Sequence, residues 1–172
     1  MNAKKCTVII LIFSALLLGG CRNKPAVEDN EPIDFRLDTL GHERFYLNQH
    51  RGKTVLLVFW STWCIPCKSE LVALQSLASS PEFKDVIFAG VCNDPENLDD
   101  VKRIVKTLEI NYLVLLDNQA QVSNKLGVKA VPTAIIVNAE GKITLKEEGY
   151  DTATMKQIKN HIESLVALSK NL

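Results

Sequence analysis

The sequence lacks a net charge, an internal repeat and a hydrophobic run long enough to cross a membrane. Basic and acidic residues number 20 each among 172, so there is no electrostatic reason to expect a nucleic acid as the main partner. The longest apolar run, residues 8–18, falls short of the ~20 residues that a spanning helix needs. With 47% hydrophobic and 23% charged residues, the composition excludes wholesale disorder. The length suits one domain of ordinary size.

The cysteines do not form the even, regularly spaced set that is typical of a disulfide framework. A zinc site usually brings a second pair of ligands at short spacing, and no such pair of cysteines or histidines is present. A structural disulfide within a CxxC segment would close only a tiny loop and add little stability. The close spacing of two of the five cysteines therefore favours a chemically reactive site over a structural one. The five are Cys6, Cys21, Cys64, Cys67 and Cys92.

The first 21 residues have the order of a secretory signal peptide. Lys4 and Lys5 precede the apolar run, and two glycines and Cys21 follow it. The Leu-Leu-Gly-Gly-Cys ending resembles a bacterial lipobox, which implies cleavage before Cys21 and acylation of its thiol. We therefore expect a signal peptide over residues 1–20 and a bacterial cell-envelope protein held to a membrane through Cys21. An uncleaved anchor and a free secreted protein are the alternatives.

Residues 22–32 are polar, contain two prolines and show no apolar period, which is typical of a flexible linker. The expected organisation is a tether over residues 21–32 and one folded domain over 33–172. Outside the cytoplasm disulfides can persist. Once Cys6 is removed and Cys21 acylated, three cysteines remain for chemistry.

Apolar periodicity predicts strands that alternate with helices and close on a hairpin and a helix. Such an order favours a three-layer α/β arrangement around one sheet. Asp94 followed by Pro95 has the pattern of a helix N-cap. Strands are expected over 33–37, 45–47, 54–60, 86–92, 112–116, 133–137 and 143–145, and helices over 64–80, 95–108, 119–126 and 152–169.

The Cys64-Ile-Pro-Cys67 segment directly follows a predicted buried strand and opens a predicted helix. At a helix N-terminus, unpaired N–H groups and the helix dipole favour an anion. Such a place can lower a cysteine pKa from ~8.5 into the range ~3.5–7.5. Cys67 lies one turn further on the same face. Cys64 is therefore the expected nucleophile toward a substrate disulfide, and Cys67 the thiol that resolves the mixed disulfide.

Three stretches together resemble the thioredoxin-like superfamily, and more narrowly the membrane-tethered TlpA/ResA-type thiol–disulfide oxidoreductases. They are RGKTVLLV, FWSTWCIPCKSE and, at 130–133, Ala-Val-Pro-Thr. The resemblance implies a thioredoxin-like α/β/α sandwich with a central mixed sheet and an added N-terminal β-hairpin. It also implies that Pro132 is a cis-proline facing the dithiol, that Val131 offers backbone hydrogen bonds to a substrate chain, and that Trp63 borders the same site.

The activity implied by this resemblance is reduction of protein disulfides, with apocytochrome c as one candidate substrate. A membrane thiol donor would recharge the dithiol. No cofactor or metal is expected beyond the redox-active Cys64–Cys67 disulfide. Whether the protein acts as reductant or oxidant is not readable from the motif, because CxxC proteins span ~−270 to ~−120 mV.

The sequence departs from the thioredoxin pattern at two informative positions. Thioredoxins carry an acidic residue two places before the first tryptophan of this motif, where this chain has Val58. The proton acceptor for Cys67 is therefore unassigned. Some relatives have glutamate between the cysteines, where this chain has Ile65.

Cys92, at the end of a predicted strand, has two readings. A free cysteine is commonly a small buried hydrophobe, but the carboxyl ends of parallel strands share one edge of the sheet, so Cys92 is also a candidate third redox thiol. Two other functions stay open. A peroxidase would carry Pro-x-x-x-Thr-x-x-Cys, but counting back from Cys64 gives Leu57 and Ser61. A non-catalytic binding lipoprotein would not need the thiols.

Overall fold

The structure, a computed structural model, describes residues 31–169. The predicted signal peptide, Cys21 and most of the predicted tether lie outside the described residues. No helix within 31–169 is both long enough and apolar enough to cross a membrane.

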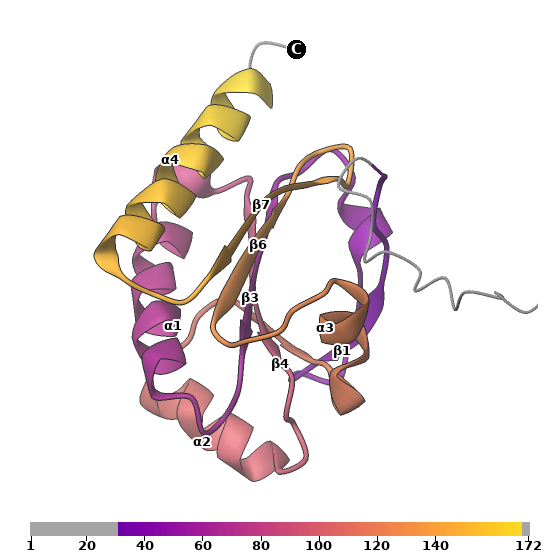
Figure 1. Cartoon of the computed structure of the whole chain (residues 1–172), viewed down its shortest axis with the longest axis vertical. Coiled ribbons are helices and arrows are strands. Elements are labelled where there is room, and N and C mark those ends of the chain that lie inside the picture. The colour runs from indigo at the N-terminus through magenta and orange to yellow at the C-terminus, as the bar shows by residue number, and fades with distance from the viewer. Residues whose placement is uncertain (1–30, 170–172) are drawn as a thin grey trace, which may run out of the picture.

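The centre of the described domain is one mixed sheet of seven strands in the order β2-β1-β5-β4-β3-β6-β7 (Figure 1). Strands β3, β4 and β5 are parallel, whereas β1 runs antiparallel to β5 and β6 antiparallel to β3. The expected N-terminal hairpin, β1–β2, forms one edge of the sheet, and the hairpin β6–β7 forms the other. The strands are β1 Arg36–Thr39, β2 Arg44–Tyr46, β3 Val55–Trp60, β4 Ile87–Cys92, β5 Leu113–Leu116, β6 Thr133–Val137 and β7 Ile143–Glu148.

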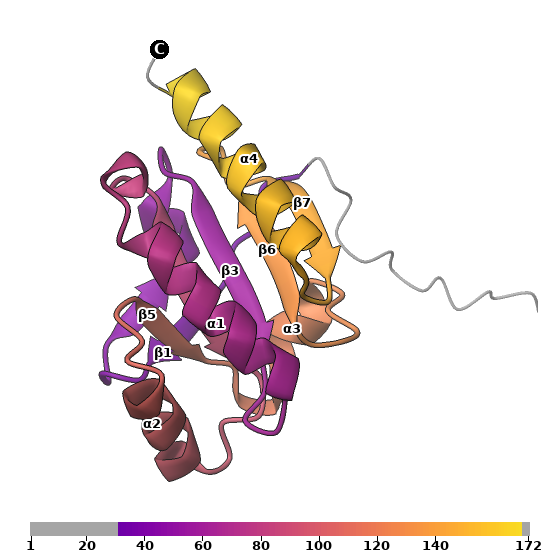
Figure 2. The ribbon, with the colours of Figure 1, turned by 90° about the vertical axis from the view of Figure 1, so that its left-hand side faces the viewer.

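Helices cover both faces of this sheet, which confirms the thioredoxin-like three-layer prediction. α1, α2 and α4 lie on one face and α3 on the other (Figures 1 and 2). Each face has its own apolar core: one includes Leu71 of α1 and Ile158 of α4, and the other includes Val122 of α3. The helices are α1 Ile65–Ala78, α2 Leu98–Thr107, α3 Gln121–Lys125 and α4 Thr152–Ser169.

β3 lies between β4 and β6, and all six of its residues are buried. Its uncharged sequence is what a strand covered on both faces requires. Val58, where thioredoxins carry an acid, is fully buried within it. β3 therefore delivers the chain to the start of α1 from a rigid, central position.

Several predicted boundaries shift. α1 begins at Ile65 and ends at Ala78, inside the predicted range 64–80. The second predicted strand stops at Tyr46, because Leu47 begins a short 3₁₀ helix. The prediction of Asp94 as an N-cap was wrong. Asn97 caps α2, and its side chain accepts a hydrogen bond from the Asp99 N–H.

Candidate active site

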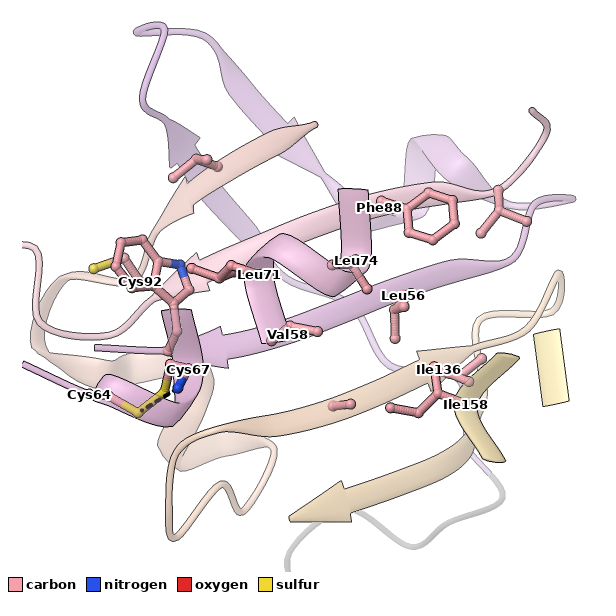
Figure 3. Close-up of a cluster of buried hydrophobic side chains, with 14 of the residues drawn as sticks. Leu56, Val58, Cys64, Cys67, Leu71, Leu74, Phe88, Cys92, Ile136 and Ile158 are labelled. Atoms are coloured by element: carbon pink, nitrogen blue, oxygen red, sulfur yellow. Dashed lines mark hydrogen bonds between the residues drawn. A yellow bond between two sulfur atoms is a disulfide. The ribbon is translucent and has the colours of Figure 1, made fainter. Parts of the chain in front are cut away.

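Cys64 and Cys67 lie at the junction of β3 and α1, joined by a disulfide. A turn precedes them, in which the Cys64 N–H donates to the Ser61 carbonyl at 3.1 Å. Cys64 is the N-cap of α1, and its Sγ accepts from the Cys67 N–H at 3.2 Å. A sulfur that accepts a helix N-terminal N–H is placed to be stabilised as a thiolate when the disulfide is reduced. Figure 3 shows the pair at one end of the apolar cluster beneath α1.

The loop before β6 faces this disulfide. The Val131–Pro132 peptide bond is cis, as the resemblance implied. The Val131 carbonyl oxygen lies 3.8 Å from Cys64 Sγ. The loop is held by hydrogen bonds from the Thr133 hydroxyl to the Ala130 carbonyl and from the Gly149 N–H to the Pro132 carbonyl. The structure thus brings Val131 and Pro132, separated from the cysteines by more than 60 residues, to the reactive sulfur.

Two large apolar side chains flank the nucleophile at the surface. Trp63 is 71% exposed and Ile65 is 76% exposed, whereas Cys64 between them is 2% exposed. Exposed apolar side chains that adjoin one another are typical of contact surfaces for a partner. The site is therefore a shallow apolar rim around a nearly covered sulfur, which suits a polypeptide segment as the substrate.

Asp94 and Asn93, in the loop after β4, hold the turn that leads to Cys64. The Asp94 carboxylate accepts from the Thr62 N–H at 2.9 Å and from the Thr62 hydroxyl at 2.7 Å. The Ser61 hydroxyl donates to Asn93 Oδ1 at 2.6 Å. Two consecutive residues of one loop therefore fix two consecutive residues of the other. This role replaces the helix-capping role that was predicted for Asp94.

Cys92 is a free, fully buried thiol, and its sulfur donates to Asp94 Oδ1 at 3.3 Å. Burial raises the pKa of this thiol far above its ordinary range, and the nearby Asp94 carboxylate adds to that shift. Figure 3 draws Cys92 apart from the Cys64–Cys67 disulfide. These properties favour the reading of Cys92 as a small buried residue, because the reactive form of a cysteine is the thiolate.

Glu70 is the last residue of the FWSTWCIPCKSE stretch, but no role was predicted for it. It lies one turn after Cys67 on α1, it is fully buried, and neither carboxylate oxygen has a hydrogen-bond partner among the described residues. Burial raises its pKa to about 7. One signal in the sequence could have found it. Glu70 lies at helical spacing on the same buried stripe as Cys67, Leu71 and Leu74, where a charged residue is otherwise not expected.

A buried carboxyl group with a pKa near neutrality can take up a proton and release it again. Positions three apart in a helix face each other, so Glu70 is placed to serve Cys67. Glu70 also adds to the raised pKa of Tyr112, which burial mainly causes. β3 carries no acid at Val58, and the buried carboxyl group nearest in sequence to Cys67 is that of Glu70 on α1.

Within residues 31–169, no three His, Cys, Asp or Glu side chains lie close enough together to hold a metal ion. His161 lies 3.0 Å from the Thr144 hydroxyl, and His50 stacks on Phe45, 4.7 Å between ring centres. Neither histidine is among the groups around the cysteines.

Comparison with known proteins agrees with this geometry. A family model described as the AhpC/TSA family matches residues 29–146. The thiol-disulfide oxidoreductase ResA of Geobacillus thermodenitrificans is 33% identical over 132 residues, which cover 77% of this chain and 74% of the relative.

Two crystal structures have the same fold. StoA of Bacillus subtilis superimposes with a TM-score of 0.65 at 26% identity, over 79% of this chain and 98% of StoA. A structure from Chlorobium tepidum, described as a thiol:disulfide interchange protein DsbE, superimposes with a TM-score of 0.73 at 23% identity. The match covers 79% of this chain and 95% of the Chlorobium chain.

The fold and the dithiol together define a thioredoxin-like thiol:disulfide oxidoreductase. The chain belongs to the AhpC/TSA family.

Proposed function

We propose that this protein reduces disulfides of other proteins at the cell envelope. The observation that carries the proposal is the Cys64–Cys67 pair at the start of α1, facing the Val131–Pro132 loop and bordered by the exposed Trp63. Val131 would offer backbone hydrogen bonds to a bound substrate chain, and Trp63 an apolar contact. The redox-active pair itself carries the electrons, and no further cofactor is part of the proposal.

The reaction needs only the dithiol and one proton acceptor. The Cys64 thiolate attacks a substrate disulfide, forms a mixed disulfide and expels the other substrate sulfur as a thiolate. Cys67 passes its proton to Glu70 and attacks Cys64 Sγ, which releases the second substrate thiolate. Two electrons move to the substrate, and the Cys64–Cys67 disulfide remains. A membrane thiol donor would then reduce it again.

Two measurements on the purified soluble domain test the direction of this reaction. The equilibrium reduction potential is expected near the reducing end of the range ~−270 to ~−120 mV. The Cys67→Ala variant is expected to trap oxidised apocytochrome c, our candidate substrate, as a mixed disulfide. A potential near the oxidising end would contradict a reductase. A domain that neither reduces insulin nor traps a partner would favour a non-catalytic binding protein.

A peroxidase is a weaker proposal for this site. Leu57 is buried in β3 where such a motif needs proline, and Ser61 replaces its threonine. The Ser61 hydroxyl is engaged with Asn93, so it is not free to bind a peroxide.

A further inference from the structure

A hollow of about 420 Å³ opens beside the active-site turn, between the start of α1 and the length of α2. None of its lining residues belongs to the Val131–Pro132 loop. The hollow is therefore separate from the place where that loop faces Cys64. Trp63 forms one wall and directly precedes the nucleophile in the chain. The lining residues are Thr62, Trp63, Lys68, Asp100, Arg103, Ile104, Thr107 and Leu108.

The walls of this hollow are fixed by contacts outside it. Thr62 is held through both its N–H and its hydroxyl by Asp94. α2 is tied to α1 by the Gln75 side-chain amide, which donates to the Leu108 carbonyl at 3.2 Å. Ile104 is buried between the helix and the sheet. The hollow is therefore a stable feature of the surface beside Cys64.

Its charge is positive. Asp100 and Arg103 pair with each other on α2, and Asp100 also accepts from the Asn97 amide. Lys68 is half-buried and makes no hydrogen bond or ion pair with any residue in the range 31–169. A cation in the first turns of a helix is disfavoured by the helix dipole, and no carboxylate within residues 31–169 forms an ion pair with Lys68. The exposed Trp63 ring and Leu108 add apolar surface.

These features complement a side chain with an apolar stem and a negative end. Resting on the proposed reduction of protein disulfides, we propose that the hollow binds a glutamate or aspartate of the substrate polypeptide, close in sequence to the cysteine that Cys64 attacks. Lys68 lies one helical turn from Cys64, about 6 Å. An extended chain advances ~3.3 Å per residue, so the acidic residue lies two or three positions from the substrate cysteine.

The test compares disulfide-linked peptide dimers that differ only in one residue, Glu or Gln, two or three positions from cysteine on either side. For each protein variant the readout is the ratio of kcat/KM for the Glu peptide to that for the Gln peptide, so changes in the reactivity of Cys64 itself cancel. The native protein is expected to favour the Glu peptide about three- to fivefold at low salt, and less at high salt.

Lys68→Gln is expected to bring this ratio to about one, and Lys68→Glu to invert it. Lys156→Glu, which makes the same charge change at an exposed lysine on α4, is the matched control and should keep the native ratio. A native ratio of one, or a ratio that Lys68→Glu leaves unchanged, would overturn the proposal. If neither peptide were reduced at all, the proposed function would fail, and this binding site with it.

Discussion

Glu70 shows how one residue's environment gives it a role that its identity alone does not. A glutamate on a helix is usually solvated, but this one is enclosed, and neither of its oxygens has a hydrogen-bond partner within residues 31–169. Burial raises its pKa from the usual 4.5 to about 7, because the charged form has lost its water. A carboxyl group with a pKa near neutrality, one helical turn from Cys67, is what the proposed proton transfer requires.

Replacing this acceptor should slow the step that Cys67 performs. In Glu70→Gln we expect at least about a tenfold slower release of substrate from the mixed disulfide, since a positioned acid or base typically contributes 10²–10⁴-fold. The rate should also lose its inflection near pH 7. Stopped-flow measurement of product release over pH 5–9 checks this. Glu82→Gln, at an exposed position, is the control, and an unchanged pH profile in Glu70→Gln would contradict the assignment.

The same substitution should change stability in a pH-dependent way. Between pH 4.5 and about 7, the folded protein keeps a proton on Glu70, whereas the unfolded chain has already lost it. The stability that this proton contributes is fully present below pH 4.5 and is lost as the pH rises through about 7. Glu70→Gln should therefore be more stable than the native protein at pH 8, by roughly 2–3 kcal/mol, and nearly equal at pH 4. Urea unfolding at the two pH values measures this difference. If the free energy of unfolding rose by the same amount at pH 4 and pH 8, burial of the Glu70 charge would not be the cause of the stabilisation.

The Asp94 carboxylate joins two elements, because it ties the loop between β4 and α2 to the turn before α1. Asp94→Asn keeps an oxygen for the Thr62 N–H and removes the negative charge. We expect its reduced Cys64 to be alkylated faster than in the native protein at mildly acidic pH, since the loop that holds the turn before Cys64 then carries one negative charge less.

Asp94→Ala removes both the charge and the hydrogen bonds to Thr62, and should lose about 1–3 kcal/mol of stability together with insulin reductase activity. Iodoacetamide kinetics and thermal unfolding measure the two effects, with the exposed Asp85→Asn as control. If Asp94→Ala behaved like the native protein, the turn would not depend on this clamp.

At the scale of elements, α1 packs onto the sheet at a point where a glycine leaves little spare room. A Cβ on Gly90 of β4 would lie 3.2 Å from Trp60 Nε1 and 3.3 Å from Leu71 Cδ2. Both neighbours are fully buried and cannot yield freely. Gly90→Ala is therefore expected to destabilise the fold by about 1–3 kcal/mol.

Denaturant unfolding of Gly90→Ala measures that cost. Gly41→Ala is the control, because a Cβ there meets only the Thr39 hydroxyl at an ordinary 3.7 Å, and it should change stability by no more than about 0.5 kcal/mol. Equal effects of the two substitutions would show that helix packing on Gly90 is not tight.

The mixed sheet brings distant segments together at one end of its central strands, where β3 and β4 finish and β6 begins. β3 and β4 are parallel, so the turn after Trp60 and the loop after Cys92 emerge side by side. β6 pairs antiparallel with β3, so its beginning, Thr133, lies beside Phe59. The loop just before it places the Val131 carbonyl oxygen 3.8 Å from Cys64 Sγ. The topology of three strands thus assembles the site from three separate stretches of sequence.

At the scale of the whole molecule, the proposed envelope location rests on the N-terminal sequence. We expect the native protein, expressed in a bacterial host, to incorporate labelled fatty acid and to sediment with membranes. Cys21→Ser should abolish both and leave the reduction potential unchanged, because the dithiol lies within residues 31–169 and Cys21 lies outside them. Metabolic labelling with fractionation provides the readout. Labelling that survives Cys21→Ser would contradict a lipid anchor at this residue.

Much of this could be predicted from the sequence, because the relevant signals are local. The uncharged β3 run and the CxxC spacing each occupy a few adjacent residues, and they predicted the reactive pair. The alternation of strands and helices predicted the layers, and the family resemblance implied the cis-proline. The boundaries of α1 and β2 were less accurate, since helix and strand ends depend on which neighbours satisfy the last backbone groups.

By itself, then, the sequence determined the chemistry that adjacent residues can carry, namely two thiols one helical turn apart at a helix start. Only the tertiary structure decided which side chains lose their water and which meet across the sheet. Burial raises the pKa of Glu70 and that of the Cys92 thiol, and Asp94 holds the turn before Cys64 instead of capping a helix. Burial and long-range hydrogen bonding set the energies of these groups, and both arise only when β3, β4 and α1 have packed together.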